Sequence, residues 1–143
     1  MADEIIEKEL SYKIMKAAFE VHNQFGPGFP ESIYDEAMAR ELVACGMTIE
    51  RQKRVTVCYK GKALGEFVLD NIVNGHVILE YKAASEISPI HEQQALSYFK
   101  ATGLELAIVI NFGALRVQSS RVVNTKGKLT RPSRASQFTR KQP

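Results

Sequence analysis

The chain has 143 residues, of which 45% are hydrophobic and 24% charged, as is typical of one globular domain. It has no apolar run near the roughly 20 residues that a membrane span needs, and its acidic start, Met1-Ala2-Asp3-Glu4, is unlike a signal peptide. Cys45 and Cys58 stand apart, without the spacing of zinc ligands. We therefore expect a cytoplasmic protein with reduced thiols and no structural zinc.

The net charge of +3 is distributed unevenly along the chain. Residues 125–143 hold six basic side chains and no acidic one, which leaves residues 1–124 with a net charge of −3. We expect one domain over residues 1–124 and a flexible basic tail over residues 125–143. The tail is either a solubilising end or a segment that contacts phosphates without recognising sequence.

The first part of the chain predicts two helices. An apolar stripe with three- and four-residue spacing marks the first, and Gly26-Pro27-Gly28 ends it. The stripe consists of Ile6, Leu10, Ile14, Ala17, Val21 and Phe25. A second helix, residues 31–45, begins after Pro30 and ends at Gly46.

Three strands follow, at about residues 48–59, 63–73 and 76–83. The turns between them are Lys60-Gly61-Lys62 and Asn74-Gly75. These short connections predict an antiparallel meander.

The remaining elements predict a crossover. A third helix runs from Ser88, the expected N-cap, to Ala101. Residues 104–110 form a continuous apolar run, typical of a strand that is covered on both faces, and residues 114–123 form a last, more exposed strand. The expected fold class is α/β: a mixed central sheet, made of the antiparallel meander plus the crossover strand and flanked by helices.

Charged residues interrupt two of the apolar strands. Asp70 lies in one, and Glu80 and Lys82, two residues apart and therefore on one face, end the next. Two carboxylates and a lysine at neighbouring strand ends indicate a site for a divalent cation and for chemistry at lysine. The alternative is a salt bridge at a sheet edge.

Two helices carry further candidate residues. Glu31 begins the second helix, where the helix dipole alone would explain a carboxylate. Gln94 and Tyr98 share one face of the third helix, which a solvated surface would also explain. His91, in the first turn of that helix, is expected to be a capping or surface residue rather than a general base.

Together these residues carry a resemblance to a known family. The motifs are Gly28-x-x-Glu31-x-x-Tyr34, Asp70, Glu80-x-Lys82-Ala83, His91-Glu92-x-Gln94-x-x-x-Tyr98 and Asn111-Phe112-Gly113. From about Glu4 to Val123 the chain resembles the bacterial and archaeal GxxExxY proteins, which are similar to the PD-(D/E)xK nuclease superfamily, and its Gln-x-x-x-Tyr helix resembles the RecB-like branch. The resemblance implies a restriction-endonuclease-like core. One departure is Tyr81, where a branched aliphatic residue is commoner.

The residue types fit a magnesium site, with manganese as the substitute. Magnesium prefers oxygen ligands in octahedral geometry and usually keeps several waters. The expected protein ligands are Glu31, Asp70, Glu80 and the backbone carbonyl of Tyr81. Lys82 would stabilise charge in the transition state or position the nucleophile, Gln94 would orient neighbouring groups, and Tyr98 would contact a phosphate. Lys82 as a plain counter-charge is the alternative.

The turn at Asn74-Gly75 sets a geometric condition on this site. A two-residue hairpin would place Asp70 and Glu80 on opposite faces of the sheet. A three-residue turn with Gly75 in the left-handed region would place them on the same face. We predict the three-residue turn, against the usual preference of Asn-Gly.

The leading functional hypothesis is a magnesium-dependent phosphodiesterase that acts on DNA or RNA. The alternative is a catalytically silent nuclease-fold module for nucleic-acid binding or protein assembly, which the acidic body favours. The chain has no Gly-rich phosphate loop, which disfavours a third hypothesis, a small-molecule binding domain. The expected partners are nucleic acid and a second copy of the chain, with no membrane. Asn111-Phe112-Gly113 is expected to be a structural turn.

Overall fold

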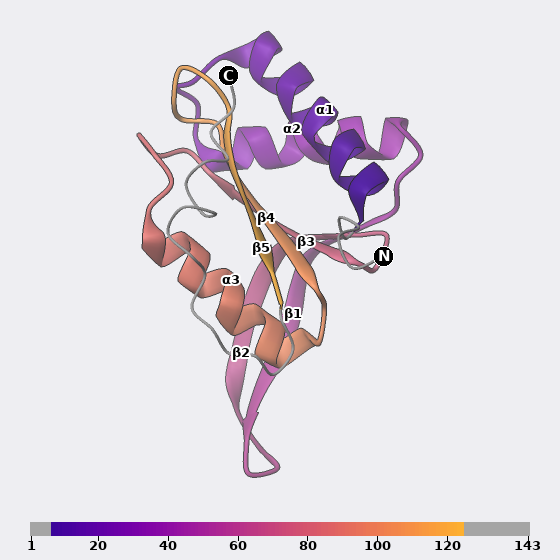
Figure 1. Cartoon of the computed structure of the whole chain (residues 1–143), viewed down its shortest axis with the longest axis vertical. Coiled ribbons are helices and arrows are strands. Elements are labelled where there is room, and N and C mark those ends of the chain that lie inside the picture. Colours follow the sequence, from indigo (N-terminus) through magenta and orange to yellow (C-terminus); the bar gives the residue numbers. More distant parts are fainter. Residues whose placement is uncertain (1–6, 125–143) are drawn as a thin grey trace.

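The computed structural model describes residues 7–124, so the basic tail expected at residues 125–143 lies outside the described residues. Three helices and five strands make up the fold (Figure 1). In chain order they are α1 (Lys8–Phe25), α2 (Glu31–Ala44), β1 (Ile49–Tyr59), β2 (Lys62–Val73), β3 (Val77–Lys82), α3 (Pro89–Thr102), β4 (Leu106–Asn111) and β5 (Gln118–Val123).

The five strands form one mixed sheet in the order β1-β2-β3-β4-β5. β3 and β4 are parallel and α3 connects them, whereas the other neighbouring strands are antiparallel. This arrangement confirms the predicted meander followed by a crossover strand. No helix in residues 7–124 is long and apolar enough to span a membrane.

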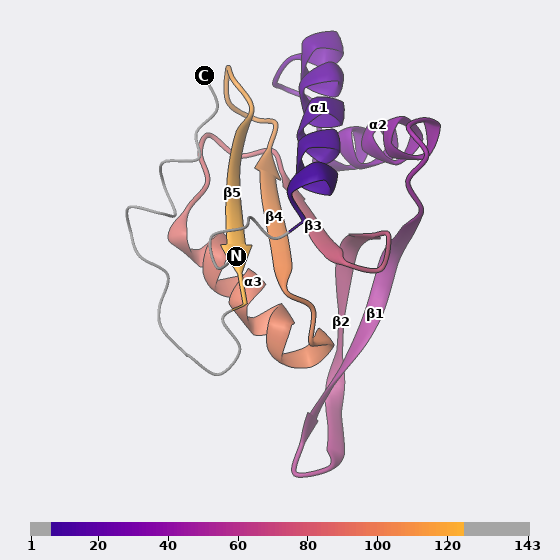
Figure 2. The ribbon, with the colours of Figure 1, turned by 45° about the vertical axis from the view of Figure 1, so that its right-hand side comes forward.

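Helices cover both faces of the sheet (Figure 2). Leu79 and Tyr81 of β3 point to one face, where they pack with buried residues of α1 and α2. Ile78, the residue before Leu79, points to the other face and packs there with Ala95 and Phe99 of α3. The buried hydroxyphenyl ring of Tyr81 also contacts Phe112, so the aromatic residue at this position is part of the core.

The last strand differs from the expectation. It begins at Gln118 rather than at residue 114, and Ser119, Ser120 and Val122 are buried rather than exposed. The Ser120 hydroxyl donates a hydrogen bond to the Glu92 carboxylate, so α3 packs over this strand. Polar serines on a covered face gave the sequence pattern of an exposed strand.

The turn between β2 and β3 has the predicted register. Val73 pairs with Val77, so the loop contains the three residues 74–76, and Gly75 lies in the left-handed region with a φ of 72°. The His76 N–H closes the turn on the Val73 carbonyl at 2.9 Å. This register pairs Asn71 with Leu79, which places Asp70 and Glu80 on the same face of the sheet.

Strands β1 and β2 continue well beyond the rest of the sheet. In residues 53–69, which we call the arm, they pair with each other, whereas the pairing of β2 with β3 covers only residues 71–73. The arm projects away from α1 and α2, and its tip, the turn Lys60-Gly61, extends beyond α3 (Figures 1 and 2). Nearly all of its side chains are exposed.

Candidate active site

Asp70 and Glu80 face each other where β2 and β3 separate. The backbone ladder between these strands stops at the pair Asn71–Leu79. Beyond it, the Asp70 N–H donates to Glu80 Oε2 at 3.2 Å, and the Tyr81 N–H donates to Asp70 Oδ2 at 2.9 Å. The two carboxyl groups therefore occupy the place of the missing ladder bonds, and each satisfies a backbone donor of the opposite strand.

The other neighbour of Asp70 is also irregular. β1 pairs Arg51 with Asn71 and Lys53 with Leu69, but Gln52, opposite Asp70, is left out of the ladder. Gln52 has a φ of 50°, a sparsely populated conformation for a residue with a side chain. Such strain often accompanies functional sites, and here it lies directly beside a candidate metal ligand.

Burial makes the carboxyl pair a poor place for two negative charges. Glu80 is 7% exposed, and its pKa is raised to about 8, first by burial and then by the charge of Asp70. Burial also raises the pKa of Asp70. The Lys82 ammonium partly offsets both shifts. Desolvation therefore affects the pKa of Glu80 more than repulsion by Asp70 does.

Lys82 ends β3 next to this pair. Its carbonyl accepts a hydrogen bond from the Phe112 N–H at 2.9 Å. Beyond it, the Asn111 side chain donates to the Ala84 carbonyl and accepts from the Ala84 N–H, both at 2.9 Å. The chain after Lys82 is thus fixed to the end of β4 by backbone-like bonds.

Gly113 completes this attachment. A Cβ atom at Gly113 would lie 2.4 Å from the Ala84 carbonyl oxygen and 2.6 Å from the Ala83 carbonyl carbon, so only glycine fits. Asn111-Phe112-Gly113 therefore does more than form the expected turn, because these residues also fix the strand end that carries Lys82. A glycine after a buried strand was the signal available in the sequence, but the segment it contacts is distant along the chain.

Helix α3 lies over the carboxyl pair. Tyr98 is half-buried, stacks on Phe67, and has a pKa raised to about 12 by burial and by Glu80 and Asp70. His91 Nδ1 accepts a hydrogen bond from the Ser88 N–H at 3.2 Å, which agrees with the expected capping role.

Burial and the nearby Lys82 ammonium lower the pKa of His91.

Gln94 is exposed and makes no hydrogen bond to the carboxyl pair in the described part of the chain. Its role in orienting other groups stays a prediction.

Tyr34 fixes the start of α2. Its buried hydroxyl donates to the Gly26 carbonyl and accepts from the Phe29 N–H at 3.2 Å. Its ring stacks on Phe112 with centroids 4.7 Å apart. Gly28 between these partners has a φ of 116°, which a side chain would rarely tolerate. The tyrosine and glycine of the Gly-x-x-Glu-x-x-Tyr motif thus position the helix turn that carries its glutamate.

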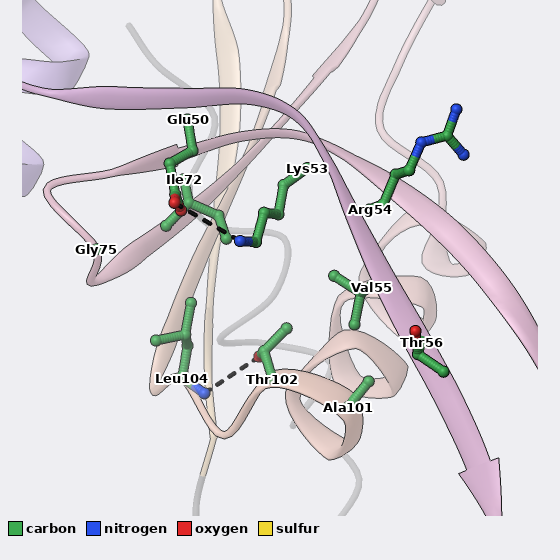
Figure 3. A pocket seen from close by; sticks show the side chains of 10 residues that line it. All are labelled: Glu50, Lys53, Arg54, Val55, Thr56, Ile72, Gly75, Ala101, Thr102 and Leu104. Carbon is green, nitrogen blue, oxygen red and sulfur yellow. Dashed lines mark hydrogen bonds and ion pairs between the residues drawn. The ribbon is translucent and has the colours of Figure 1, made fainter. Parts of the chain in front are cut away.

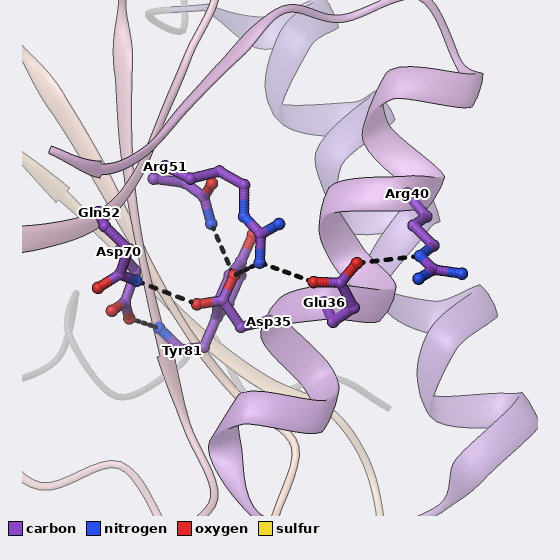
Figure 4. A network of polar contacts seen from close by, with 8 residues as sticks. Asp35, Glu36, Arg40, Arg51, Gln52, Asp70 and Tyr81 are labelled. Atoms are coloured by element: carbon purple, nitrogen blue, oxygen red, sulfur yellow. Dashed lines mark hydrogen bonds and ion pairs between the residues drawn. The ribbon is translucent and has the colours of Figure 1, made fainter.

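Asp35, one helical turn after Glu31, contacts the strands of the site (Figure 4). Its carboxylate accepts hydrogen bonds from Arg51 at 3.3 Å, Gln52 at 3.4 Å and Asn71 at 3.5 Å. Sequence reasoning missed this residue, because nothing in the helical pattern separates it from a surface carboxylate.

Glu31 itself is exposed at the first position of α2. Among residues 7–124, no three His, Cys, Asp or Glu side chains form a group that could hold a metal ion. The structure therefore brings Asp70, Glu80 and Lys82 together, with His91 and Tyr98 beside them. It shows no contact of Glu31 with this group in the described residues, so its role as a ligand stays a prediction.

Comparison with known proteins agrees with this geometry. A family model described as the PD-(D/E)XK nuclease superfamily matches residues 8–122. Among solved structures, the crystal structure of SSO0001 is similar in fold, with a TM-score of 0.54 and 14% sequence identity. That match covers 68% of this chain but 51% of the other, so this chain spans about half of that protein's length. No curated protein matches. A match over most of the chain, together with paired strand-end carboxylates followed by lysine, shows that this protein belongs to the PD-(D/E)XK nuclease superfamily.

Proposed function

We propose that the chain is a metal-dependent phosphodiesterase that cleaves DNA or RNA. The observation that carries the proposal is the Asp70–Glu80 pair, which interrupts the sheet on the same face as Lys82. A fold without a catalytic role has no evident need for two facing carboxyl groups, one of them almost fully buried, beside a break in each neighbouring ladder.

The donor set fits magnesium or manganese. Asp70 and Glu80 supply two hard oxygen ligands, and one or two carboxylates with waters are the usual protein contribution to a magnesium site. The backbone carbonyl of Tyr81 is the proposed third ligand. Glu31 is the proposed fourth, because it lies one turn before Asp35 on the same face of α2, and the charge of Asp35 contributes to the raised pKa of Asp70.

The roles of the chain's own residues follow from their positions. Asp70 and Glu80 would hold the cation, which when bound polarises the phosphate and lowers the pKa of water. Lys82 would stabilise the negative charge that develops on the phosphate, because its ammonium is the cation that most directly offsets the carboxyl pair. Tyr98 keeps its hydroxyl proton at neutral pH, since its pKa is about 12, and would donate a hydrogen bond to a phosphate oxygen.

The alternative is a catalytically silent member of the same superfamily. It is favoured by the raised pKa of Glu80, which keeps this carboxyl protonated near neutral pH in the metal-free protein. In a protein that never binds metal, Glu80 would stay protonated and hydrogen-bonded to the Asp70 N–H. A measurement of metal binding therefore distinguishes the phosphodiesterase from the silent module.

Two substitutions test the proposal through different steps. Asp70→Asn should abolish both magnesium binding and cleavage, because the metal loses an anionic ligand. Lys82→Ala should leave magnesium binding within about twofold and reduce cleavage by 100-fold or more, in the range of other electrostatic groups that act on the transition state. Calorimetry with magnesium or manganese measures the first step. Incubation with single- and double-stranded DNA and RNA measures the second.

Matched controls come from the exposed face of α1. Glu20→Gln and Lys13→Ala remove the same charges from exposed positions and should change neither readout. Glu31→Gln then shows whether that carboxylate is a ligand, since a ligand's loss weakens metal binding. A wild-type protein that binds neither metal would contradict the phosphodiesterase and support the silent module. Cleavage that persists in both site variants would place the chemistry elsewhere.

A further inference from the structure

The arm has a net positive charge, whereas the rest of the described residues have a net negative charge. Residues 53–69 contain four basic side chains and one acidic side chain, whereas the other described residues contain nine basic and thirteen acidic ones. The basic residues of the arm are Lys53, Arg54, Lys60 and Lys62. A positive projection on a negative body directs a polyanion to the projection.

Of the four basic side chains of the arm, the two at its tip are free to bind a phosphate. Lys53 pairs with Glu50 at 3.6 Å, and Arg54 with Glu66 at 3.4 Å. Within the described residues, Lys60 and Lys62 form no ion pair, and both are exposed. The Lys60 ammonium lies over the ring of Tyr59, 5.2 Å from its centroid. Because the ring carries no net charge, the ammonium keeps its full charge for a phosphate.

The base of the arm is fixed against α3. Phe67 stacks on Tyr98 with ring centroids 4.9 Å apart and an angle of 13° between the planes. A cavity of about 580 Å³ lies beside this stack, between the arm and α3. Another, of about 380 Å³, lies between β1 and the C-terminal end of α3, and Lys53 and Thr102 are among the residues that line it (Figure 3). An isolated two-stranded hairpin is marginally stable, so this base sets the arm's direction relative to the carboxyl pair.

We propose that the arm lies in the major groove of duplex DNA and that Lys60 and Lys62 contact phosphates there. This inference rests on the proposed nuclease function and adds where the substrate runs. The major groove of B-DNA admits a two-stranded β-ribbon, whereas that of an RNA duplex is too narrow for side chains to read. The arm is a two-stranded ribbon with a net positive charge, and it pairs with no other strand in the described residues.

The arm also sets a distance. Eight residues separate Asp70 from Lys62 along β2, and a strand rises about 3.3 Å per residue, so the tip lies about 26 Å from the site. At about 3.4 Å per base pair, that is about eight base pairs from the bond that is cleaved. A short duplex centred on the site cannot reach the tip.

The test is a double variant that preserves the turn. Lys60 and Gly61 both have positive φ, as in a type I′ turn, where Asn-Gly is favoured. Lys60→Asn with Lys62→Gln therefore removes both charges without straining the hairpin. The matched control is Lys13→Gln with Lys16→Gln, two exposed lysines of α1.

Binding is measured by fluorescence anisotropy with calcium, over a range of salt concentrations, to a 30-base-pair DNA duplex and to the same sequence as RNA. The tip variant should bind the DNA about tenfold more weakly at 0.1 M salt, with a log–log salt slope shallower by up to about 1.8. The control should match the wild type on both duplexes, and RNA binding should be unchanged by the tip variant. Cleavage of a 10-base-pair duplex should also be unchanged.

Four outcomes would overturn the inference. They are an unchanged salt slope on DNA, an equal loss on RNA, a wild type that binds no DNA duplex, and a change in sedimentation mass without a change in DNA affinity. The last would make the arm an interface between copies of the chain. Metal-dependent cleavage of any nucleic acid would still support the phosphodiesterase in each case, so the two ideas fail separately.

Discussion

Glu80 is the residue in which stability and the proposed activity conflict most directly. The residue is 7% exposed and its carboxyl accepts a hydrogen bond from the Asp70 N–H, but burial and Asp70 disfavour the ionised form. Binding of a cation requires that ionised form. The fold therefore holds a ligand in its protonated state until a positive charge replaces the proton.

The stability of the protein should consequently depend on pH through Glu80. In the unfolded chain its pKa is near 4.5, and in the fold it is about 8, so between these values the folded state binds more protons. The free energy of unfolding should fall as pH rises through this window, by up to about 5 kcal/mol in total from this group. Denaturant titrations at pH 5 and pH 8 measure the change.

Glu80→Gln isolates this effect, because the amide keeps the shape of the protonated carboxyl. The variant should lose most of the pH dependence and be more stable than the wild type at pH 8, while losing magnesium binding. Magnesium binding to the wild type at pH 7 should release up to about one proton, which calorimetry in buffers of different ionisation enthalpy detects. A flat stability profile in the wild type would mean that Glu80 is already ionised.

Gly113 gives a second prediction at the scale of one residue. Gly113→Ala places a methyl group against the backbone of Ala83 and Ala84, which cannot move like a side chain. Overpacking should cost about 1–3 kcal/mol of unfolding free energy, and displacement of the segment after Lys82 should reduce cleavage as well. Thermal unfolding and the cleavage assay measure the two effects.

Gly65→Ala is the matched control. Gly65 lies in the arm, and a Cβ atom there would have no heavy atom within 4 Å. Because alanine suits a strand interior better than glycine, this variant should be as stable as the wild type or slightly more stable. Equal melting temperatures for both glycine variants would show that the contact with Ala84 has no energetic weight.

At the scale of elements, the hairpin between β2 and β3 decides whether a site exists. Turn statistics for Asn-Gly favour two residues, but the observed loop has three. The requirement that two carboxylates share a face predicted the correct register, while local propensity predicted the wrong one. The site requirement predicted the register better than the turn statistics did, because a one-residue slip would have moved every side chain of β3 to the other face.

The order and type of the elements were also predictable, because apolar periodicity and glycine turns lie in contiguous sequence. The contacts of the site were less so. Asp35 reaches Asn71 across 36 residues, and Asn111 reaches Ala84 across 27. A helix pattern or a turn motif contains no information about such partners. The projection of the arm was missed for the same reason, since its strands look like those of a complete sheet.

At the scale of the whole molecule, the sheet separates two hydrophobic cores of unequal size. The core beneath α1 and α2 has seventeen buried residues, and the core beneath α3 has seven. Burial of apolar side chains is the main source of stability, so the two sides should resist unfolding unequally. The candidate active site, with Asp70, Glu80 and Tyr98, lies on the side with the smaller core.

Native-state hydrogen exchange should reveal this asymmetry as partial opening. Amides of α3 should exchange through a sub-global opening of lower free energy than the amides of β3 and β4, which both cores protect. Equal opening energies in α3 and α1 would contradict it. The element that covers the carboxyl pair would thus be the first to detach, and a ligand held between α3 and the sheet should slow exchange in α3 more than anywhere else in the described chain.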